Sequence, residues 1–290
     1  MRVAIYSDVG LRDNLEDEAR AVLIKDFFHQ DREAALLMMA DGAGGHNAGE
    51  VASGMAVNRI PSSLAGAIIS RLSTDVGAPV KVSVVVDLMV DRLVEANRAV
   101  VERAQLSTGQ AGMATTVVCG VILDGMFFVA WAGDTRCYLY SRHRLQQLTR
   151  DHSEAERLRA AGLLHGVDLR DHPLAHTITR YLGQTKDFSP EVRICRLVPG
   201  DVVLMGTDGL TDALTEEEII RELAFYDAGL MAFEDLPSRL VGASLAAGAT
   251  DNVTVLCYQY QPDALPLAHE INETLTGAYP AALESVLETI

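Results

Sequence analysis

The sequence predicts an α+β protein in which helices cover β-sheets, because blocks of strand-like runs alternate with long helical stretches. The helical stretches are residues 48–72, where we expect a break near Pro61, and residues 84–105. Short turns join several of the strand-like runs into hairpins, which disfavours a regular array of parallel strands and crossover helices. The strand-like runs are residues 3–6, 34–40, 116–123, 126–132, 137–140, 202–205 and 253–260.

Local signals support these elements from the first residue onward. The opening run carries one charge and a short apolar stretch before Ser7, which is typical of a strand and not of a secretory signal. In the second helical stretch, apolar residues recur at helical spacing from Leu88 to Val100. Thr215 followed by Glu218 predicts a capping box that opens a further helix. We therefore expect these strands and helices to form, and we expect no secretory signal at the start of the chain.

The last part of the chain differs in composition from the rest. Residues 261–290 hold five acids and no Lys or Arg, and apolar residues near the end fall on one helical face. We expect an acidic amphipathic helical tail here, following a single domain formed by residues 1–260. Docking of this helix on its own domain and docking on a partner both stay open.

Charge, cysteines and hydropathy exclude several classes of function. A formal net charge of −16 argues against a nucleic-acid partner, because such binding needs a cationic face. The apolar runs are too short to span a bilayer, so no membrane partner is expected. The cysteines fit no metal-binding spacing and lie in apolar runs, as in a reduced cytoplasmic protein; they are Cys119, Cys137, Cys195 and Cys257. We expect a cytoplasmic monomer.

Acidic residues recur where apolar runs meet turns. Taken singly, Asp-Gly and Asp-Asn pairs are ordinary turn formers. If the strands converge on one end of a sheet structure, however, their carboxylates repel one another unless cations lie between them. The residues are Glu16 and Asp17 after the first run, Asp41 with Gly42, Asp134, Asp208 with Gly209, and Asp251 with Asn252.

Ligands of this kind select the metal and the chemistry. Oxygen donors without cysteine or an obligatory histidine favour Mg²⁺ or Mn²⁺ over Zn²⁺ or Cu²⁺. Two such ions a few ångströms apart can share a hydroxide, lower its pKa and direct it at phosphorus. The pattern therefore predicts a phosphoester hydrolase.

Several ordered motifs resemble the metal-dependent protein phosphatases of the PPM, or 2C, type, particularly their bacterial members. The likeness spans roughly residues 2–260. Its motifs are SDVGLRDNLEDEA, ADGAGGHNAGEVAS, GMATTVV, WAGDTRCYLY, ITRYLG, DVVLMGTDGLTDALTEEEI and TDNVTVL. The resemblance implies a four-layer α-β-β-α sandwich of two antiparallel-rich sheets flanked by helices, with the metal centre at one end. It also implies hydrolysis of phosphoserine and phosphothreonine in protein substrates, opposite a Ser/Thr kinase.

The resemblance also assigns roles to individual residues. Asp41 would bridge two Mn²⁺ or Mg²⁺ ions, and Arg12 would bind the substrate phosphate. Asp41, Asp208 and Arg12 would thus be catalytic. The remaining implied ligands are the Gly42 carbonyl, Asp208 and Asp251 for the core pair, Glu16 and Asp17 through bound water, and Asp134 and Asp212 with Asp208 for a third, weaker ion.

The chemistry of some of these residues fits the implied roles, whereas other positions depart from the family pattern. A guanidinium such as that of Arg12 matches phosphate oxygens through parallel hydrogen bonds. Glycines at 42, 44 and 45 permit a carbonyl to turn toward a metal. Animal relatives carry a proton-donating histidine where this sequence has Ala43, so water or another residue must supply that proton. His46 is a nearby candidate for this donor. Three further residues depart from the family pattern and affect the expected details of the loops: Leu15 replaces an asparagine, Ala114 a glycine and His176 an asparagine.

A glycine-rich stretch also raises the possibility of a nucleotide-binding module. The stretch GAGGHNAG follows an apolar run but lacks the Gly-Lys-Ser/Thr of a P-loop and the third glycine of a dinucleotide site. A non-catalytic partner-binding relative and a hydrolase of small phosphoesters remain alternatives. Residues 142–196, here called the basic segment, hold ten Lys or Arg against seven Asp or Glu. We expect this segment to steer phosphoproteins through Arg157, Arg159 and Arg170.

Overall fold

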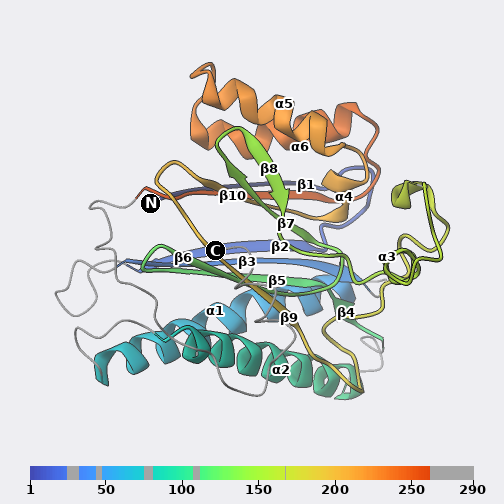
Figure 1. The fold of residues 1–290 in the computed structure, drawn as a ribbon. Coiled ribbons are helices and arrows are strands. Elements are labelled where there is room, and N and C mark those ends of the chain that lie inside the picture. The colour runs from blue at the N-terminus through green and yellow to red at the C-terminus, as the bar shows by residue number, and fades with distance from the viewer. Residues whose placement is uncertain (25–32, 44–47, 75–80, 107–111, 167, 262–290) are drawn as a thin grey trace.

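The computed structural model describes residues 1–24, 33–43, 48–74, 81–106, 112–166 and 168–261. Two antiparallel sheets pack face to face, and helices cover the outer face of each sheet (Figure 1). This arrangement confirms the four-layer α-β-β-α sandwich expected from the sequence. The predicted helical tail lies beyond residue 261 and so outside the described residues.

One sheet carries the N-terminal strand at its edge and is covered by α5 (Glu216–Asp227) and α6 (Leu236–Ala246). A short helix, α4 (Asp208–Thr211), follows its third strand, and a 3-10 turn, η4 (Phe233–Asp235), precedes α6. The order of its strands is β1 (Arg2–Asp8), β11 (Val253–Gln259), β10 (Val202–Gly206), β7 (Arg136–Ser141) and β8 (Arg144–Gln147).

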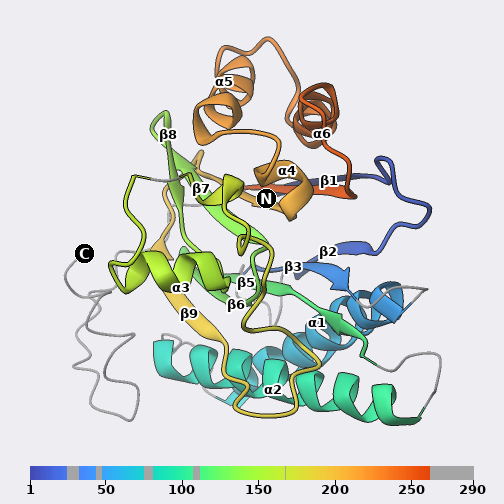
Figure 2. The ribbon, with the colours of Figure 1, turned by 90° about the vertical axis from the view of Figure 1, so that its right-hand side faces the viewer.

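The other sheet is covered by α1 (Ala48–Thr74) and α2 (Val82–Leu106). Its strand order is β2 (Asp17–Ile24), β3 (Ala34–Ala43), β5 (Val117–Leu123), β6 (Met126–Ala132) and β9 (Glu191–Arg196), with β4 (Ala114–Thr115) paired to β3. Between β8 and β9 the chain forms α3 (Glu154–Ala160) and the 3-10 turn η3 (Leu169–Asp171). Figure 2 looks onto the end of the sandwich where α3 and α4 lie.

The central strand β3 shows why its sequence is apolar without interruption. Leu36 and Met38 pack on the side of α1 and α2, whereas Leu37 and Met39 pack between the two sheets. All four side chains are 0% exposed. Because alternate residues of a strand face opposite sides, a strand buried on both faces needs apolar residues at every position.

Two differences from the sequence expectations concern local structure. Helix α1 continues through Pro61, so the predicted break is wrong. Ile60 and Leu64 on either side of the proline are buried in the apolar core, and this packing outweighs the lost backbone hydrogen bond. Strands β2, β8 and β9 were not predicted, and each lies at an edge of its sheet, where charged residues weaken the apolar pattern.

Other expectations are confirmed. Thr215 and Glu218 form the predicted capping box, with both reciprocal hydrogen bonds, at the start of α5. The four cysteines are free, and each lies in a strand. Within the described part of the chain, no helix has the length and apolar character needed to cross a membrane.

Candidate active site

The topology brings distant acidic residues to one end of the sandwich. Asp17 begins β2 and Asp41 lies near the end of β3, and the two are direct partners in the strand register. On the other sheet, β10 ends just before Asp208, and its antiparallel neighbour β11 begins just after Asp251. Asp41 and Gly42 belong to β3 itself, so the expectation that they form a turn is wrong.

Asp17 and Asp41 form the inner part of the site. Asp17 is 3% exposed, and its Oδ2 accepts a hydrogen bond of 2.8 Å from Thr207 Oγ1. Burial raises the pKa of Asp17 to about 7, despite the hydrogen bond from Thr207, and nearby Asp208 contributes. Burial, followed by the charge of Asp208, also holds the pKa of Asp41 well above its ordinary value.

The backbone of Asp41 is fixed by two threonines. Its N–H donates to Thr116 Oγ1 at 2.9 Å, and its carbonyl accepts from the N–H of Thr116 and from Thr115 Oγ1, both at 2.8 Å. These bonds leave the Asp41 carboxylate as the part of the residue that faces other charges. Such anchoring suits a ligand that must hold one geometry.

Asp208 opens the short helix α4. The N–H of Asp212 donates to the Asp208 carbonyl at 2.8 Å, so the two acids stand one helical turn apart on the same face. Burial, then the charges of Asp212 and Asp251, raise the pKa of Asp208 to about 6. A Cβ at Gly209 would lie 2.0 Å from the Asn252 carbonyl oxygen, so only glycine lets α4 approach the start of β11 this closely.

The loop that carries Arg12 is tied to the same strand start. Arg12 Nη2 donates to Asp251 Oδ2 at 2.6 Å, with the Arg12 side chain 60% exposed at the rim of the site. Asn252 donates through Nδ2 to the carbonyls of Val9 and Asn14, and its Oδ1 accepts from the N–H of Glu16. The buried Asn252 amide therefore holds both ends of the Arg12 loop.

Gly42 lies where three segments meet. Its N–H donates to the Glu16 carbonyl at 3.2 Å, and a Cβ at position 42 would lie 2.4 Å from the backbone of Gly49. A Cβ at Gly49 would in turn lie 2.3 Å from Glu16 Oε2. Close packing, and not a left-handed backbone, requires glycine at position 42. The other two glycines of this motif and His46 lie outside the described residues.

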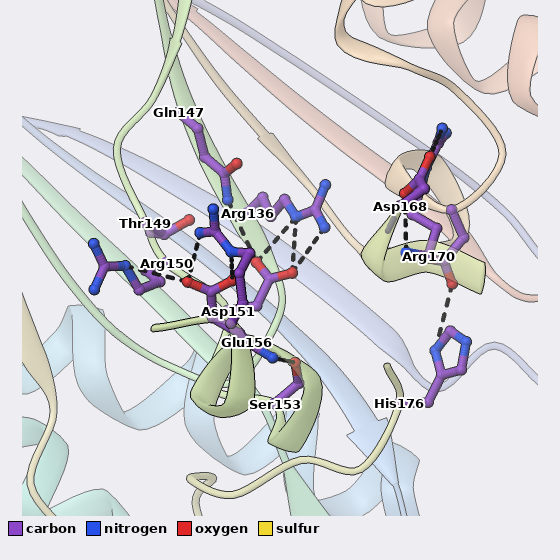
Figure 3. Close-up of polar contacts among 12 residues, drawn as sticks. Arg136, Gln147, Thr149, Arg150, Asp151, Ser153, Glu156, Asp168, Arg170 and His176 are labelled. Carbon is purple, nitrogen blue, oxygen red and sulfur yellow. Dashed lines mark hydrogen bonds and ion pairs between the residues drawn. The ribbon is translucent and has the colours of Figure 1, made fainter. Parts of the chain in front are cut away.

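A polar pocket adjoins the aspartates on the side of α3. It is lined by Asp134, Asp208, Asp212, Arg136, Asp151 and His176, among others. Burial and the charge of Asp208 hold the pKa of Asp134 well above its ordinary value. Arg136 and Asp151 form an ion pair of 2.7 Å in the pocket wall (Figure 3).

The structure thus brings together every acidic residue that the sequence singled out. We call Asp17, Asp41, Asp134, Asp208, Asp212 and Asp251 the aspartate cluster. Glu16 lies at its edge, where burial raises its pKa against the effect of Arg12. Two nearby residues carry a role that the sequence did not assign to them. Asn252 was expected only as the turn partner of Asp251, and His176 only as a departure from the family pattern.

The donor set of the cluster fits hard divalent cations. Its members are carboxylates, and the pKa values that rise do so because burial and like charges disfavour ionisation of the acids. A divalent cation removes both penalties at once. Oxygen donors of this kind suit Mg²⁺ or Mn²⁺. The chemistry of the cluster therefore supports a metal-assisted hydrolytic site.

The arginines of the basic segment are arranged differently from the sequence expectation. Arg157 contacts Glu154 at 2.5 Å, Arg159 contacts Glu156 at 2.6 Å, and Arg170 contacts Asp168 at 2.6 Å. Each positive charge is therefore largely balanced by an acid no more than three residues away. Steering of a phosphoprotein by this segment stays a prediction, and the pairing leaves less uncompensated positive charge to attract the substrate.

Comparison with known proteins points to one family. The sequence profile described as protein phosphatase 2C matches residues 19–241, which is more than half of the chain. The chain is similar to the protein phosphatase PhpP of Streptococcus pneumoniae serotype 2 (strain D39), with 30% identity over 256 residues. That match covers 88% of this chain and 96% of the relative.

Solved structures give the same picture. The fold is similar to the serine/threonine phosphatase of S. agalactiae, with a TM-score of 0.75 and 27% identity, covering 89% of this chain and 99% of the other. It is also similar to the catalytic domain of the serine/threonine phosphatase PstP in complex with two manganese ions. There the TM-score is 0.68 with 27% identity, covering 88% of this chain and 96% of the other.

Proposed function

The chain belongs to the protein phosphatase 2C family as a metal-dependent serine/threonine protein phosphatase of bacterial type, and we propose that the aspartate cluster is its Mn²⁺ or Mg²⁺ centre. The observation that supports this assignment most is the crowding of carboxylates with raised pKa values at one end of the sandwich, where Asp17 is buried and Asp41 and Asp208 are partly buried. Such crowding is unfavourable in a protein that binds no cation there.

Individual ligands follow from where each group lies. Asp41, Asp208 and Asp251, with the Gly42 carbonyl, would hold the core pair of ions. Glu16 and Asp17 would act through bound water, and Asp134 and Asp212 would hold a third ion with Asp208. When bound, such ions lower the pKa of water and polarise a phosphoryl group, which is the chemistry that phosphoester hydrolysis needs.

Arg12 would position the phosphate of the substrate. Its guanidinium lies exposed at the rim, in contact with Asp251, and five N–H donors make that contact compatible with binding phosphate oxygens as well. The hydrogen bonds of Asn252 hold the backbone on both sides of Arg12. Because the loop is already held in place, binding of the phosphate to Arg12 does not have to order the loop as well.

Proton transfer to the leaving group needs a donor other than residue 43, because the alanine side chain has no proton to give. Water or another residue must supply it. We further propose that the substrates are cytoplasmic phosphoproteins made by a Ser/Thr kinase, that residues 1–260 form the catalytic domain, and that the protein is monomeric.

One experiment tests the metal centre directly. A phosphothreonine peptide should be hydrolysed only when Mn²⁺ or Mg²⁺ is present, and Asp208→Ala should remove this activity. The loss should exceed the roughly 10- to 100-fold drop that follows loss of an outer-shell partner. Asp235→Ala, which changes an exposed aspartate at the start of α6, should retain wild-type activity. Hydrolysis that survives chelation, or that persists in Asp208→Ala, contradicts the assignment.

A further inference from the structure

A histidine reaches the aspartate cluster from the segment between η3 and β9. The side chain of His176 is 60% exposed, and its Nδ1 lies 3.6 Å from Asp212 Oδ2. Figure 3 shows its ring directed at a carboxylate across the pocket. This distance exceeds the usual range for a hydrogen bond of about 2.7–3.2 Å, so a hydrogen bond does not account for the approach.

The approach involves two carboxylates and not one. One ligand atom each from His176, Asp208 and Asp212 lies within 4.8 Å of the others. The two aspartates stand on one face of the turn at α4, and His176 closes the arrangement from the opposite segment.

These separations suit shared ligation of one ion. Two ligands about 2.1 Å from an ion lie roughly 3 Å apart when adjacent and about 4.2 Å apart when opposite. The Nδ1 to Oδ2 distance of 3.6 Å falls between these limits. The three ligand atoms all lie within 4.8 Å of one another, so small side-chain rotations bring the group within these limits.

We propose that His176 is a nitrogen ligand of the third ion, which it binds together with Asp208 and Asp212. This inference rests on the proposed metal centre and adds to it a ligand that the sequence analysis did not foresee. Carboxylates alone favour Mg²⁺ and Mn²⁺, whereas an imidazole shifts preference toward ions such as Ni²⁺ and Zn²⁺. The third site would therefore differ from the core pair in metal selectivity.

Ligation by His176 would also join two segments of the chain. His176 belongs to the segment that follows α3, whereas Asp208 and Asp212 belong to the turn after β10. An ion held by all three residues would join these two segments, which are otherwise far apart in the sequence. Binding of the third ion would thus fix the outer segment against the aspartate cluster.

Calorimetric titration with Mn²⁺ and Ni²⁺ tests the proposal on the full chain. In His176→Ala, the weakest Mn²⁺ affinity should fall at least about tenfold, and the Ni²⁺ affinity of that site should fall further. The tighter core sites should be unchanged. His176→Asn, which offers an amide oxygen of similar size, should keep more of the Mg²⁺ affinity than of the Ni²⁺ affinity.

A matched control comes from a second histidine–aspartate contact. His143, in the turn between β7 and β8, has its Nδ1 2.7 Å from Oδ2 of Asp227 at the end of α5, and neither residue lines the pocket. His143→Ala should leave all metal affinities unchanged. If it lowers the weakest affinity as much as His176→Ala does, the effect is not specific and the proposal fails.

Pulsed electron paramagnetic resonance of bound Mn²⁺ provides a direct readout of the bond. Wild-type protein at saturating Mn²⁺ should show a ¹⁴N coupling from a directly bound imidazole, and both His176 variants should lack it. An identical ¹⁴N signal in the variants, or an unchanged weakest affinity, overturns the assignment of His176. Absence of any tight Mn²⁺ site in the wild type would instead contradict the proposed metal centre.

Discussion

Acidic residues have opposite surroundings in two neighbouring regions of this molecule. In the basic segment, Glu154 and Asp168 each face an arginine close in sequence, and the hydrogen bonds from Arg170 lower the pKa of Asp168 to about 2. In the aspartate cluster, burial raises the pKa of Asp17 to about 7. The same chemical group therefore differs by several pKa units between the two regions.

This difference in pKa shows which carboxylates of the fold are available to bind cations. Where an arginine is near, a carboxylate is already compensated and offers little to a metal. In the aspartate cluster, Arg12 pairs with Asp251 at the edge, and the charges of Arg136 and Arg170 act on the outer Asp212, while burial dominates the pKa values of Asp17, Asp41, Asp134 and Asp208. The remaining carboxylates repel one another, and a divalent ion is the partner that relieves this repulsion.

The largest expected effect comes from removing one charge from the cluster. Asp41→Asn should reduce Mn²⁺-dependent hydrolysis by more than about a hundredfold, because Asp41 is the proposed bridge between the core ions. The same change should stabilise the metal-free protein by about 1 kcal/mol or more near neutral pH, since an amide avoids the cost of placing an ionisable carboxyl beside Asp17 and Asp208. Activity assays and thermal melts with chelator measure the two effects.

The matched change in the other region should act in the opposite way. Glu156 is 5% exposed and contacts Arg159 at 2.6 Å. Glu156→Gln should destabilise the protein by roughly 1–3 kcal/mol while activity stays within about twofold of wild type. If Asp41→Asn and Glu156→Gln both stabilise or both destabilise the metal-free protein, the two regions do not differ as we describe.

The second expected effect is a pH dependence that metal reverses. The folded pKa values of about 7 for Asp17 and about 6 for Asp208 lie above the value of about 3.9 in an unfolded chain. Protonation therefore favours the folded state, and this contribution is present in full below about pH 4 and is lost as the pH rises through about 6 to 7. Its size is on the order of a few kcal/mol.

Melting temperatures measured with chelator should accordingly fall between about pH 5 and pH 8. Mn²⁺ affinity should rise over the same range, because the carboxylates must lose protons to bind metal. In Asp41→Asn, the fall in melting temperature should be shallower. A metal-free melting temperature that rises with pH across this window contradicts the assigned shifts.

The smallest expected effect concerns the basic segment. Neutralising Arg157, Arg159 and Arg170 together should raise the KM for a phosphoprotein by a few-fold at most, because each arginine is already paired with an acid. The KM for p-nitrophenyl phosphate should not change. Equal effects on both substrates would refute steering by this segment.

Much of the fold could be predicted because its central strands carry a strong signal. Strands such as β6, with the bounds Met126–Ala132, are buried on both faces and so are apolar throughout. Edge strands such as β2, which begins with Asp17, carry charges and were missed. The break expected at Pro61 was wrong because packing of the helix on the sheet is a tertiary effect that no local rule contains.

The candidate site divides in a similar way. Asp41, Asp208 and Asp251 were foreseen because each lies at a strand end, where local sequence marks the position. His176 was not foreseen as a site residue, because its approach to Asp212 depends on how an irregular segment folds back over the sandwich. The Arg157 pairing was also missed, since a count of charges does not reveal which ones are compensated.

Anomalous diffraction from crystals soaked in Mn²⁺ tests the central claim most directly. The account predicts manganese peaks within bonding distance of Asp41, Asp208 and Asp251, about 2.0–2.3 Å from their carboxylate oxygens. It predicts no such peak beside Glu154 or Asp168, whose charges are already paired with arginine. Manganese that leaves the aspartate cluster empty at saturating concentration would contradict the account.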